Sequence, residues 1–445
     1  MSPSADTIAA IATAPGRGGV GIIRISGPRA KEIAEAITAQ LPPERYARHT
    51  VFRDPDTKAI LDDGLLIFFK GPHSYTGEDV VELQGHGGSA VLDLVLHACL
   101  RQGARLARPG EFTERAFLNG RIDLTQAEAV ADLIDANHAS AAQAAQRALQ
   151  GQFGQRIQTI VDDLIQLRVY IESALDFAEE DIDFLADQQL VERIQALIQQ
   201  INRLETETAQ GVLIRDGLTI AIIGAPNAGK SSLLNRLTGE DLAIVTSIAG
   251  TTRDVLRAAI HLDGLPLHLV DTAGLRQSND PIEQEGIRRA HQEIQNAQAI
   301  LWLQDDHDPN PAALPELPAS TPVLHIRSKI DLTGRKPGFD AEQQIYALSA
   351  KTGMGIDSLK DALKQLVGYT PTEGGQFLAR RRHLDAIQEA KAELQAARTT
   401  LQQQHAGELC AEALRYAQNA LERITGRFTS DDLLGEIFSK FCIGK

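Results

Sequence analysis

A phosphate-binding loop constrains the fold of this chain more than any other feature of its sequence. The apolar run 219–223 is followed directly by Gly-Ala-Pro-Asn-Ala-Gly-Lys-Ser at 224–231 and then by a helix-like segment. This is the G-x-x-x-x-G-K-S pattern in the strand–loop–helix context of P-loop domains. Its backbone N–H groups and the helix N-terminus attract phosphate. We therefore expect an α/β nucleotide-binding domain, with catalytic Lys230 on the β- and γ-phosphates and Ser231 on Mg²⁺.

Three later motifs, each directly after a strand-like run, indicate a guanine nucleotide. They are Asp-Thr-Ala-Gly at 271–274, Ser-Lys-Ile-Asp at 328–331 and Ser-Ala-Lys at 349–351. Ligands gather at the carboxyl ends of such strands. Asp271 would hold Mg²⁺ through water, and Asp331 would accept from guanine N1–H and the 2-amino group, which adenine cannot satisfy. The predicted GTP contacts are Asn227, Ala228, Gly229, Lys230, Ser231, Ser232, Thr246, Ser247, Ile248, Ala249, Gly250, Thr251, Thr252, Asp271, Thr272, Ala273, Gly274, Ser328, Lys329, Asp331, Ser349, Ala350 and Lys351.

Two positions depart from the usual pattern. The guanine motif normally begins with an Asn that braces the base and the P-loop, and Ser328 replaces it, so we expect weaker guanine affinity with selectivity preserved by Asp331. Many small GTPases orient the attacking water with a Gln after Asp-x-x-Gly, and Leu275 stands there instead. Asn227 in the P-loop and the polar loop 246–254 indicate a different device. Carbonyls of that loop would face a cation, and its Thr252 is a candidate Mg²⁺ ligand. The alternative is an ordinary switch segment without an extra cation.

The pattern of apolar and polar residues changes along the chain and predicts several domains. Short apolar runs between Gly and Pro residues indicate an α+β domain at about 6–120. Helical periodicity follows to about 210, beginning with a capping-box pattern at Thr125 and Glu128, and it resumes after 375. We predict domains at 1–118, 119–212, 213–371 and 372–445, with the α/β domain inserted into one discontinuous helical domain. Two unrelated helical domains are the alternative.

Composition excludes several classes of protein. Three cysteines in 445 residues argue against a disulfide framework and fit a reducing cytosol. A net charge of −15 argues against nonspecific wrapping of nucleic acid, although it allows a local basic site for a shaped RNA. No apolar run reaches the length of a membrane span, and segment 1–14 lacks the pattern of a secretory signal. We therefore expect a cytoplasmic protein with no membrane association.

Motifs across the whole chain resemble one family. The α/β segment carries Ala-Gly-Thr-Thr-Arg-Asp and Asp-Thr-Ala-Gly-Leu, as in translation-factor-like GTPases that use potassium. The ends carry Pro-Gly-Arg-Gly-Gly-Val-Gly at 15–21, Glu-Leu-Gln-Gly-His-Gly-Gly at 82–88, Arg-Pro-Gly-Glu-Phe-Thr at 108–113, Arg-Ala-Phe-Leu-Asn at 115–119 and Phe-Cys-Ile-Gly-Lys at 441–445. Together they look like the MnmE (TrmE) family of tRNA-modification GTPases.

The resemblance implies a function that composition could not show. With the flavoprotein MnmG, which brings FAD and NADH, such a protein adds an aminomethyl or carboxymethylaminomethyl group to carbon 5 of the wobble uridine (U34) of certain tRNAs. The N-terminal domain binds a formyl- or methylene-tetrahydrofolate and forms the homodimer, and the complex with MnmG is a heterotetramer or larger. The implied fold is an α+β folate-binding domain, a discontinuous helical domain and an inserted Ras-like P-loop domain.

Individual roles also follow from the resemblance. Asn227 and Thr251 would contact K⁺ by side chain, and Thr246 and Ile248 by carbonyl, so that K⁺ acts as a fixed positive charge on the developing phosphate charge. Glu283 matches the proposed general base, acting through a bridging water; a solvated helix carboxylate is the alternative.

The folate contacts implied are Arg24, Glu82, Arg121 and Lys445, although the family commonly has Lys where Arg121 stands. Cys442, in the Cys-Ile-Gly-Lys end, is a candidate catalytic residue whose alternative is a packing role. We expect His86 to support a tight turn. The basic run 380–383 is either a solvated helix face or a surface for tRNA or MnmG.

Two functions thus remain from the sequence: a GTP-hydrolysing subunit of a tRNA-modifying enzyme, or a GTPase switch for ribosome assembly without one-carbon chemistry. The folate-like motifs and the Cys442 tail favour the first.

Overall fold

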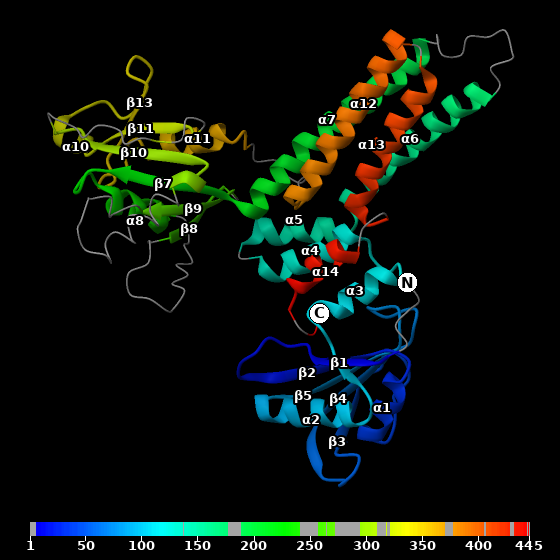
Figure 1. The fold of residues 1–445 in the computed structure, drawn as a ribbon. Coiled ribbons are helices and arrows are strands. Elements are labelled where there is room, and N and C mark those ends of the chain that lie inside the picture. The colour runs from blue at the N-terminus through cyan, green and yellow to red at the C-terminus, as the bar shows by residue number, and fades with distance from the viewer. Residues whose placement is uncertain are drawn as a thin grey trace, which may run out of the picture. The chain divides into compact units, whose positions relative to one another are not determined.

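The computed structural model describes residues 6–136, 138–176, 188–240, 257–263, 265–271, 294–308, 317, 321–369, 377–404, 406–427, 431–442 and 444. The chain divides into two compact units, and Figure 1 labels its helices and strands. One comprises Met1–Asp135, Ala145–Asn202 and Asp385–Lys445, and the other Ala136–Ala144 and Arg203–Leu384. Each unit is described by itself.

The N-terminal part of the first unit is built on a six-stranded sheet of order β3-β4-β5-β2-β1-β6. All its pairs are antiparallel except β1 with β6. The strands are β1 (Ile8–Ile11), β2 (Gly18–Ser26), β3 (Arg48–Arg53), β4 (Ile60–Phe69), β5 (Val80–Gly87) and β6 (Arg105–Leu106). Helices α1 (Ala30–Thr38), α2 (Ser89–Arg101) and α3 (Glu111–Leu118) accompany it.

Strand alternation gives this sheet two different faces. Ile23 and Ile25 of β2 enter the larger core, which also contains buried residues of α1 and α2. Arg24 lies between them in sequence and therefore points to the opposite face. There the smaller core of Ile8, Ala10 and Phe112 packs against α3. Arg24 therefore lies on the face of the sheet away from the larger core.

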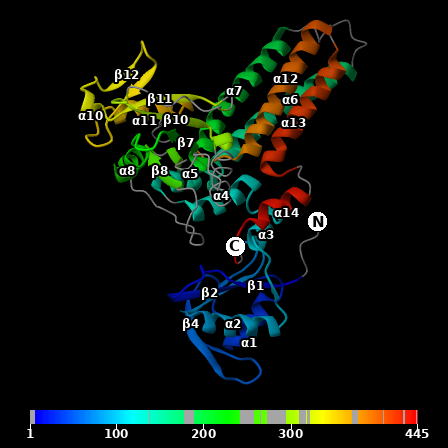
Figure 2. The same ribbon diagram turned by 60° about the vertical axis from the view of Figure 1, so that its left-hand side comes forward.

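Helices from two distant parts of the chain pack together in the first unit. They are α4 (Leu124–Asp135), α6 (Gln152–Asp176), α13 (Gly407–Thr425) and α14 (Asp431–Ser439), with residues 188–202 of α7 (Gln188–Asp216) and residues 385–404 of α12 (Arg381–Gln404). In Figures 1 and 2, α13 runs beside α6. Arg168 of α6 donates to Gln418 of α13 at 2.6 Å. The predicted insertion of an α/β domain into a discontinuous helical domain is therefore confirmed.

The predicted cap of the first helix is wrong by two residues. Helix α4 begins at Leu124, and Asp123 precedes it. Asp123 Oδ1 accepts from the Gln126 N–H at 2.8 Å, and Gln126 Oε1 accepts from the Asp123 N–H at 3.0 Å. This reciprocal pair is a capping box in which Asp and Gln take the places that the prediction gave to Thr125 and Glu128.

The second unit contains a seven-stranded sheet of order β12-β13-β11-β10-β7-β9-β8. The strands are β7 (Leu218–Gly224), β8 (Arg257–Leu262), β9 (Leu265–Asp271), β10 (Ala299–Asp305), β11 (Val323–Ser328), β12 (Gly338–Asp340) and β13 (Ile345–Ala347), with helices α8 (Lys230–Glu240), α10 (Ile330–Thr333) and α11 (Ile356–Leu366), and α5 (Ala139–Leu149) begins in this unit. The central strands are parallel, and β8 and β12 are antiparallel edges. Four successive residues of β7 at 220–223 are buried, as expected for a central parallel strand covered on both faces.

Among the helices that the structure describes, none combines the length and the apolar composition needed to cross a membrane.

Candidate functional site: a P-loop edge and an arginine–glutamate face

The P-loop joins β7 to α8 and has the backbone shape that its sequence predicts. Gly224 lies so close to β10 that an added Cβ would come within 2.3 Å of the Leu303 carbonyl oxygen. Asn227 and Gly229 have φ values of 66° and 95°, in the left-handed region that Gly and Asn tolerate best. Lys230 Nζ donates to the carbonyl oxygens of Gly224 at 2.8 Å and Ala225 at 3.0 Å. The loop therefore curls around the lysine ammonium.

The predicted magnesium ligand lies beside this lysine. Ser231 is exposed in the first turn of α8, and Ser232 next to it is also exposed. Asn227 is exposed too. The backbone of Asp271 ends β9, in register with Ile222 of β7. The sheet thus brings the end of the Asp-x-x-Gly strand next to the P-loop strand.

The guanine motifs meet at the same edge of the sheet. Asp331 Oδ1 accepts a hydrogen bond from Ser349 Oγ at 2.6 Å, and that Oγ accepts from the Thr352 N–H at 3.2 Å. The hydroxyl therefore fixes one carboxylate oxygen of Asp331. The rest of the Ser-Ala-Lys motif, Ala350 and Lys351, continues the same turn, which the Gly353 N–H closes on the Ser349 carbonyl at 2.9 Å.

Lys329 is held by a carboxylate that the sequence did not single out. Its Nζ pairs with Asp305 Oδ2 at 2.7 Å. Burial works to raise the pKa of Asp305, but the hydrogen bonds from Lys329 and the His307 N–H, together with the nearby positive charge, outweigh it and hold that pKa below its ordinary value. Asp305 ends β10, the neighbour of β11. Its position after an apolar strand was the signal in the sequence.

Ser328 lies against the P-loop. Its side chain is buried, and Oγ donates to the Ala228 carbonyl at 2.6 Å. A serine at this position therefore still supports the P-loop, because its hydroxyl reaches the loop backbone. The expectation of weaker guanine affinity stays a prediction.

Several predicted site residues lie outside the described part of the chain. They are Thr246, Ser247, Ile248, Ala249, Gly250, Thr251, Thr252, Thr272, Ala273, Gly274, Leu275, Glu283 and Lys445, together with the side chain of Asp271.

A second constellation lies on the N-terminal sheet, where Arg24 of β2 and Glu82 of β5 are register partners. Arg24 Nε and Nη2 donate to Glu82 Oε1 at 3.1 and 2.9 Å. The guanidinium also lies over the rings of Tyr75 and Phe112, at 5.5 and 5.7 Å from their centroids. Cation–π contact and the ion pair together fix its plane.

Two neighbours of this pair were missed by sequence reasoning. Gln84 Nε2 donates to Glu82 Oε2 at 3.1 Å, and its i+2 spacing on β5 was a usable signal, because such residues share a face. Tyr75 Oη is within 2.8 Å of Thr113 Oγ1, and burial raises the pKa of the phenol. No spacing rule could have placed Tyr75, which lies in a loop.

Arg121 stands apart from the pair. It is exposed, and a Cβ on Gly77 would lie 3.3 Å from its Cγ. Among the described residues, no hydrogen bond joins Arg121 to Arg24 or Glu82.

The C-terminal tail reaches the same face of the sheet. Arg24 Nη1 donates to the Gly444 carbonyl at 3.3 Å, and the Gly110 N–H donates to the Cys442 carbonyl at 3.3 Å. Gly444 has φ 96°, and an added Cβ would come within 2.2 Å of the Ile11 carbonyl oxygen. The exposed Cys442 therefore lies between α14 and the residue whose carbonyl contacts Arg24.

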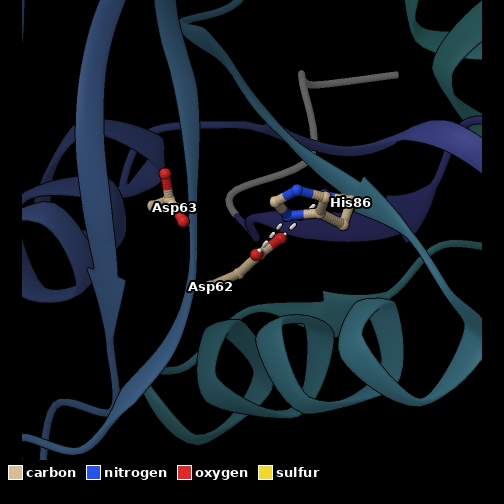
Figure 3. Close-up of side chains that lie close together, drawn as sticks. All are labelled: Asp62, Asp63 and His86. Carbon is tan, nitrogen blue, oxygen red and sulfur yellow. Dashed lines mark hydrogen bonds and ion pairs between the residues drawn. The ribbon is translucent and has the colours of Figure 1, made fainter.

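His86 lies in strand β5, not in the tight turn that was expected, because its hydrogen-bond partner is on the neighbouring strand β4. Asp62 of β4 accepts from both the His86 N–H and His86 Nδ1 at 2.7 Å (Figure 3). The nearest ligand atoms of Asp62, Asp63 and His86 lie within 4.8 Å of one another. However, Asp62 is engaged by His86, and Asp63 pairs with His49 at 3.0 Å. The two hydrogen bonds between Asp62 and His86, called the clamp below, and the Asp63–His49 pair account for these groups without a metal.

The basic run 380–383 is partly structural. His383 is buried, and its Nδ1 accepts from the Arg380 N–H at 3.1 Å at the start of α12. Arg381 is exposed. A tRNA- or MnmG-facing surface there stays a prediction.

Comparisons with known proteins cover the whole chain. It matches the family models described as "MnmE helical domain" over residues 124–442 and "GTP-binding protein TrmE N-terminus" over residues 7–121. It is 51% identical to the tRNA modification GTPase MnmE of Marinobacter nauticus, with 100% of each chain covered. It is 53% identical to that of Chromohalobacter salexigens, over 99% of this chain and 98% of the relative. The chain therefore belongs to the MnmE (TrmE) family of tRNA modification GTPases.

Proposed function

We propose that this chain is the K⁺-dependent GTP-hydrolysing subunit of the enzyme that modifies wobble uridine U34 in tRNA. The observation that carries the proposal is the meeting of the P-loop, Asp271 and Asp331 at one sheet edge in a chain whose full-length relatives are tRNA modification GTPases. Deleting the gene and analysing tRNA nucleosides tests it. We expect loss of the aminomethyl and carboxymethylaminomethyl uridines; an unchanged nucleoside profile would instead favour a ribosome-assembly switch.

Hydrolysis in this proposal uses a cation in place of the missing glutamine. The exposed carboxamide of Asn227 offers an oxygen that suits K⁺. Thr246, Ile248 and Thr251 would complete the potassium site, with Ser231 and Thr252 on Mg²⁺. The bound K⁺ supplies fixed positive charge for the transition state. Glu283 would take the proton of the attacking water through a bridging water.

Potassium dependence can be measured directly. We expect GTP turnover to be much faster in K⁺ than in Na⁺ at equal ionic strength, and Asn227→Ala to remove the difference. Equal rates of the unchanged protein in the two salts would refute the potassium proposal.

The N-terminal face is proposed to bind a tetrahydrofolate derivative. The donor set fits: the Glu82 carboxylate can accept from the amino-pyrimidine edge of a pterin, and Arg24 can donate to a carboxylate. Arg121 and Lys445 would contribute further positive charge. The bound folate supplies a one-carbon unit. Cys442 would act near it, and unchanged wobble modification in cells carrying Cys442→Ser would exclude that role.

The proposed assembly is a homodimer that joins MnmG, with its FAD and NADH, in a heterotetramer or larger complex that binds tRNA in the cytoplasm. The proposed parts are 1–118 for folate binding and dimerisation, 119–212 and 372–445 for the helical domain, and 213–371 for GTP. Light scattering of the chain with and without MnmG tests the assembly, and a monomer that ignores MnmG would contradict it.

A further inference from the structure

The hydroxyl of Ser328 makes a contact that links two halves of the nucleotide site. Ser328 ends β11 and is 3% exposed. Its Oγ lies 2.6 Å from the Ala228 carbonyl oxygen and 3.1 Å from that of Gln304. A hydroxyl carries one proton. The proton therefore goes to the nearer acceptor, the Ala228 carbonyl of the P-loop.

This hydrogen bond orients a peptide of the P-loop. In a planar trans peptide, the carbonyl of one residue and the N–H of the next point in opposite directions. Because the Ala228 carbonyl faces Ser328, the Gly229 N–H faces away from β11. Gly229 has φ 95°, and an added Cβ would make only ordinary contacts there. Because glycine has no side chain, Gly229 itself contributes only its backbone to holding this peptide in place. P-loops bind phosphate through such backbone N–H groups.

Because the hydroxyl has only one proton, Ser328 cannot also donate a hydrogen bond to the guanine base. Once its proton is donated to Ala228, the hydroxyl has none for an acceptor such as a purine nitrogen. Base recognition is left to Asp331, which a different hydroxyl, that of Ser349, holds at 2.6 Å. Two serines thus serve two halves of one site.

We propose that Ser328 is a positioning residue for the phosphate half of the site: it fixes the Ala228–Gly229 peptide for the β-phosphate and takes no part in recognising guanine. The inference rests on the proposed binding of GTP at this P-loop.

Three nucleotides and two matched substitutions test this division in the full-length protein. GDP and GMP differ in the β-phosphate. GDP and IDP differ in the 2-amino group, from which Asp331 would accept a hydrogen bond. Competition against a fluorescent GDP analogue gives the affinities. We expect Ser328→Ala to weaken GDP binding by roughly tenfold and to leave GMP binding nearly unchanged. The ratio of the GDP affinity to the IDP affinity should be preserved. Ser349→Ala, the matched control, should lower the ratio of the GDP affinity to the IDP affinity and preserve the ratio of the GDP affinity to the GMP affinity.

A second substitution protects the test from a folding defect. Ser328→Cys keeps a proton-donating γ atom, larger than oxygen and a weaker donor. We therefore expect its GDP affinity to lie between that of the unchanged protein and that of Ser328→Ala. Equal losses for GDP and GMP, or a changed GDP/IDP ratio in Ser328→Ala, would overturn the proposal. Failure of the underlying site is distinguishable, because Lys230→Ala would then bind GDP as well as the unchanged protein does.

Discussion

Replacing Glu82 by Gln tests the proposed folate face most directly. Glu82 Oε1 accepts two hydrogen bonds from Arg24, and Oε2 accepts one from Gln84. The side chains of Arg24 and Glu82 are 21% and 15% exposed, so water screens the pair only partly. The substitution preserves the shape, removes the charge and turns one acceptor into a donor.

The magnitude follows from the bonds at stake. A hydrogen bond to a charged group contributes about 1.5–3 kcal/mol, which corresponds to roughly 10- to 150-fold in affinity. We therefore expect Glu82→Gln to weaken 5-formyltetrahydrofolate binding within that range, measured by isothermal titration calorimetry on the full chain. Arg24→Met should also weaken binding. The double variant should lose less than the sum, because the two side chains are in direct contact.

The control is Asp63→Asn on the same sheet. Asp63 is 53% exposed and pairs with an exposed histidine, and exposed pairs contribute little. Its folate affinity should match that of the unchanged protein. Unaltered affinity in Glu82→Gln, or an equal loss in Asp63→Asn, would refute the assignment of the Arg24–Glu82 face.

Two further predictions concern titrating groups. Burial raises the pKa of Cys99 to about 12 and that of Cys410 to about 11, whereas Cys442 is exposed; since the thiolate is the reactive form, one thiol per chain should react rapidly with Ellman's reagent at pH 8, and Cys442→Ser should abolish that reaction. Three fast thiols in the native protein would contradict it. The hydrogen bond to Asp62 raises the pKa of His86, so the stabilisation from His86 is complete below its ordinary pKa and is lost as the pH rises through the raised value. Asp62 has a lowered pKa, because the hydrogen bonds from His86 and the Asp63 N–H, with the His86 charge, together outweigh burial, and its contribution is lost only as the pH falls through that lowered value. NMR of labelled histidine should show the raised pKa of His86 in the unchanged protein and a return toward the ordinary value in Asp62→Asn; an identical titration in both would exclude the clamp.

Much of the nucleotide edge could be predicted because its chemistry is local. Gly224, Asn227, Gly229 and Lys230 lie within a few residues of one another, and a single backbone path brings them together. The helix cap at Asp123 shows the limit of such patterns, since two overlapping candidates differ by only two residues. The helical insertion could be predicted because long half-apolar helices need partners.

The sequence by itself determined the P-loop, the strand end at Asp271, the segment after β11 that carries Asp331, and the order of the helical and α/β parts. Tertiary structure alone decided the contacts between distant segments. Arg24 meets the Gly444 carbonyl 420 residues away, and Ser328 meets the Ala228 carbonyl 100 residues away. Both acceptors are backbone carbonyls, which every residue carries, so side-chain identity gives no sign of which one is used. Sheet register and the path of the tail select the partner, and that selection turns Ser328 from a departure in a motif into a support for the phosphate loop.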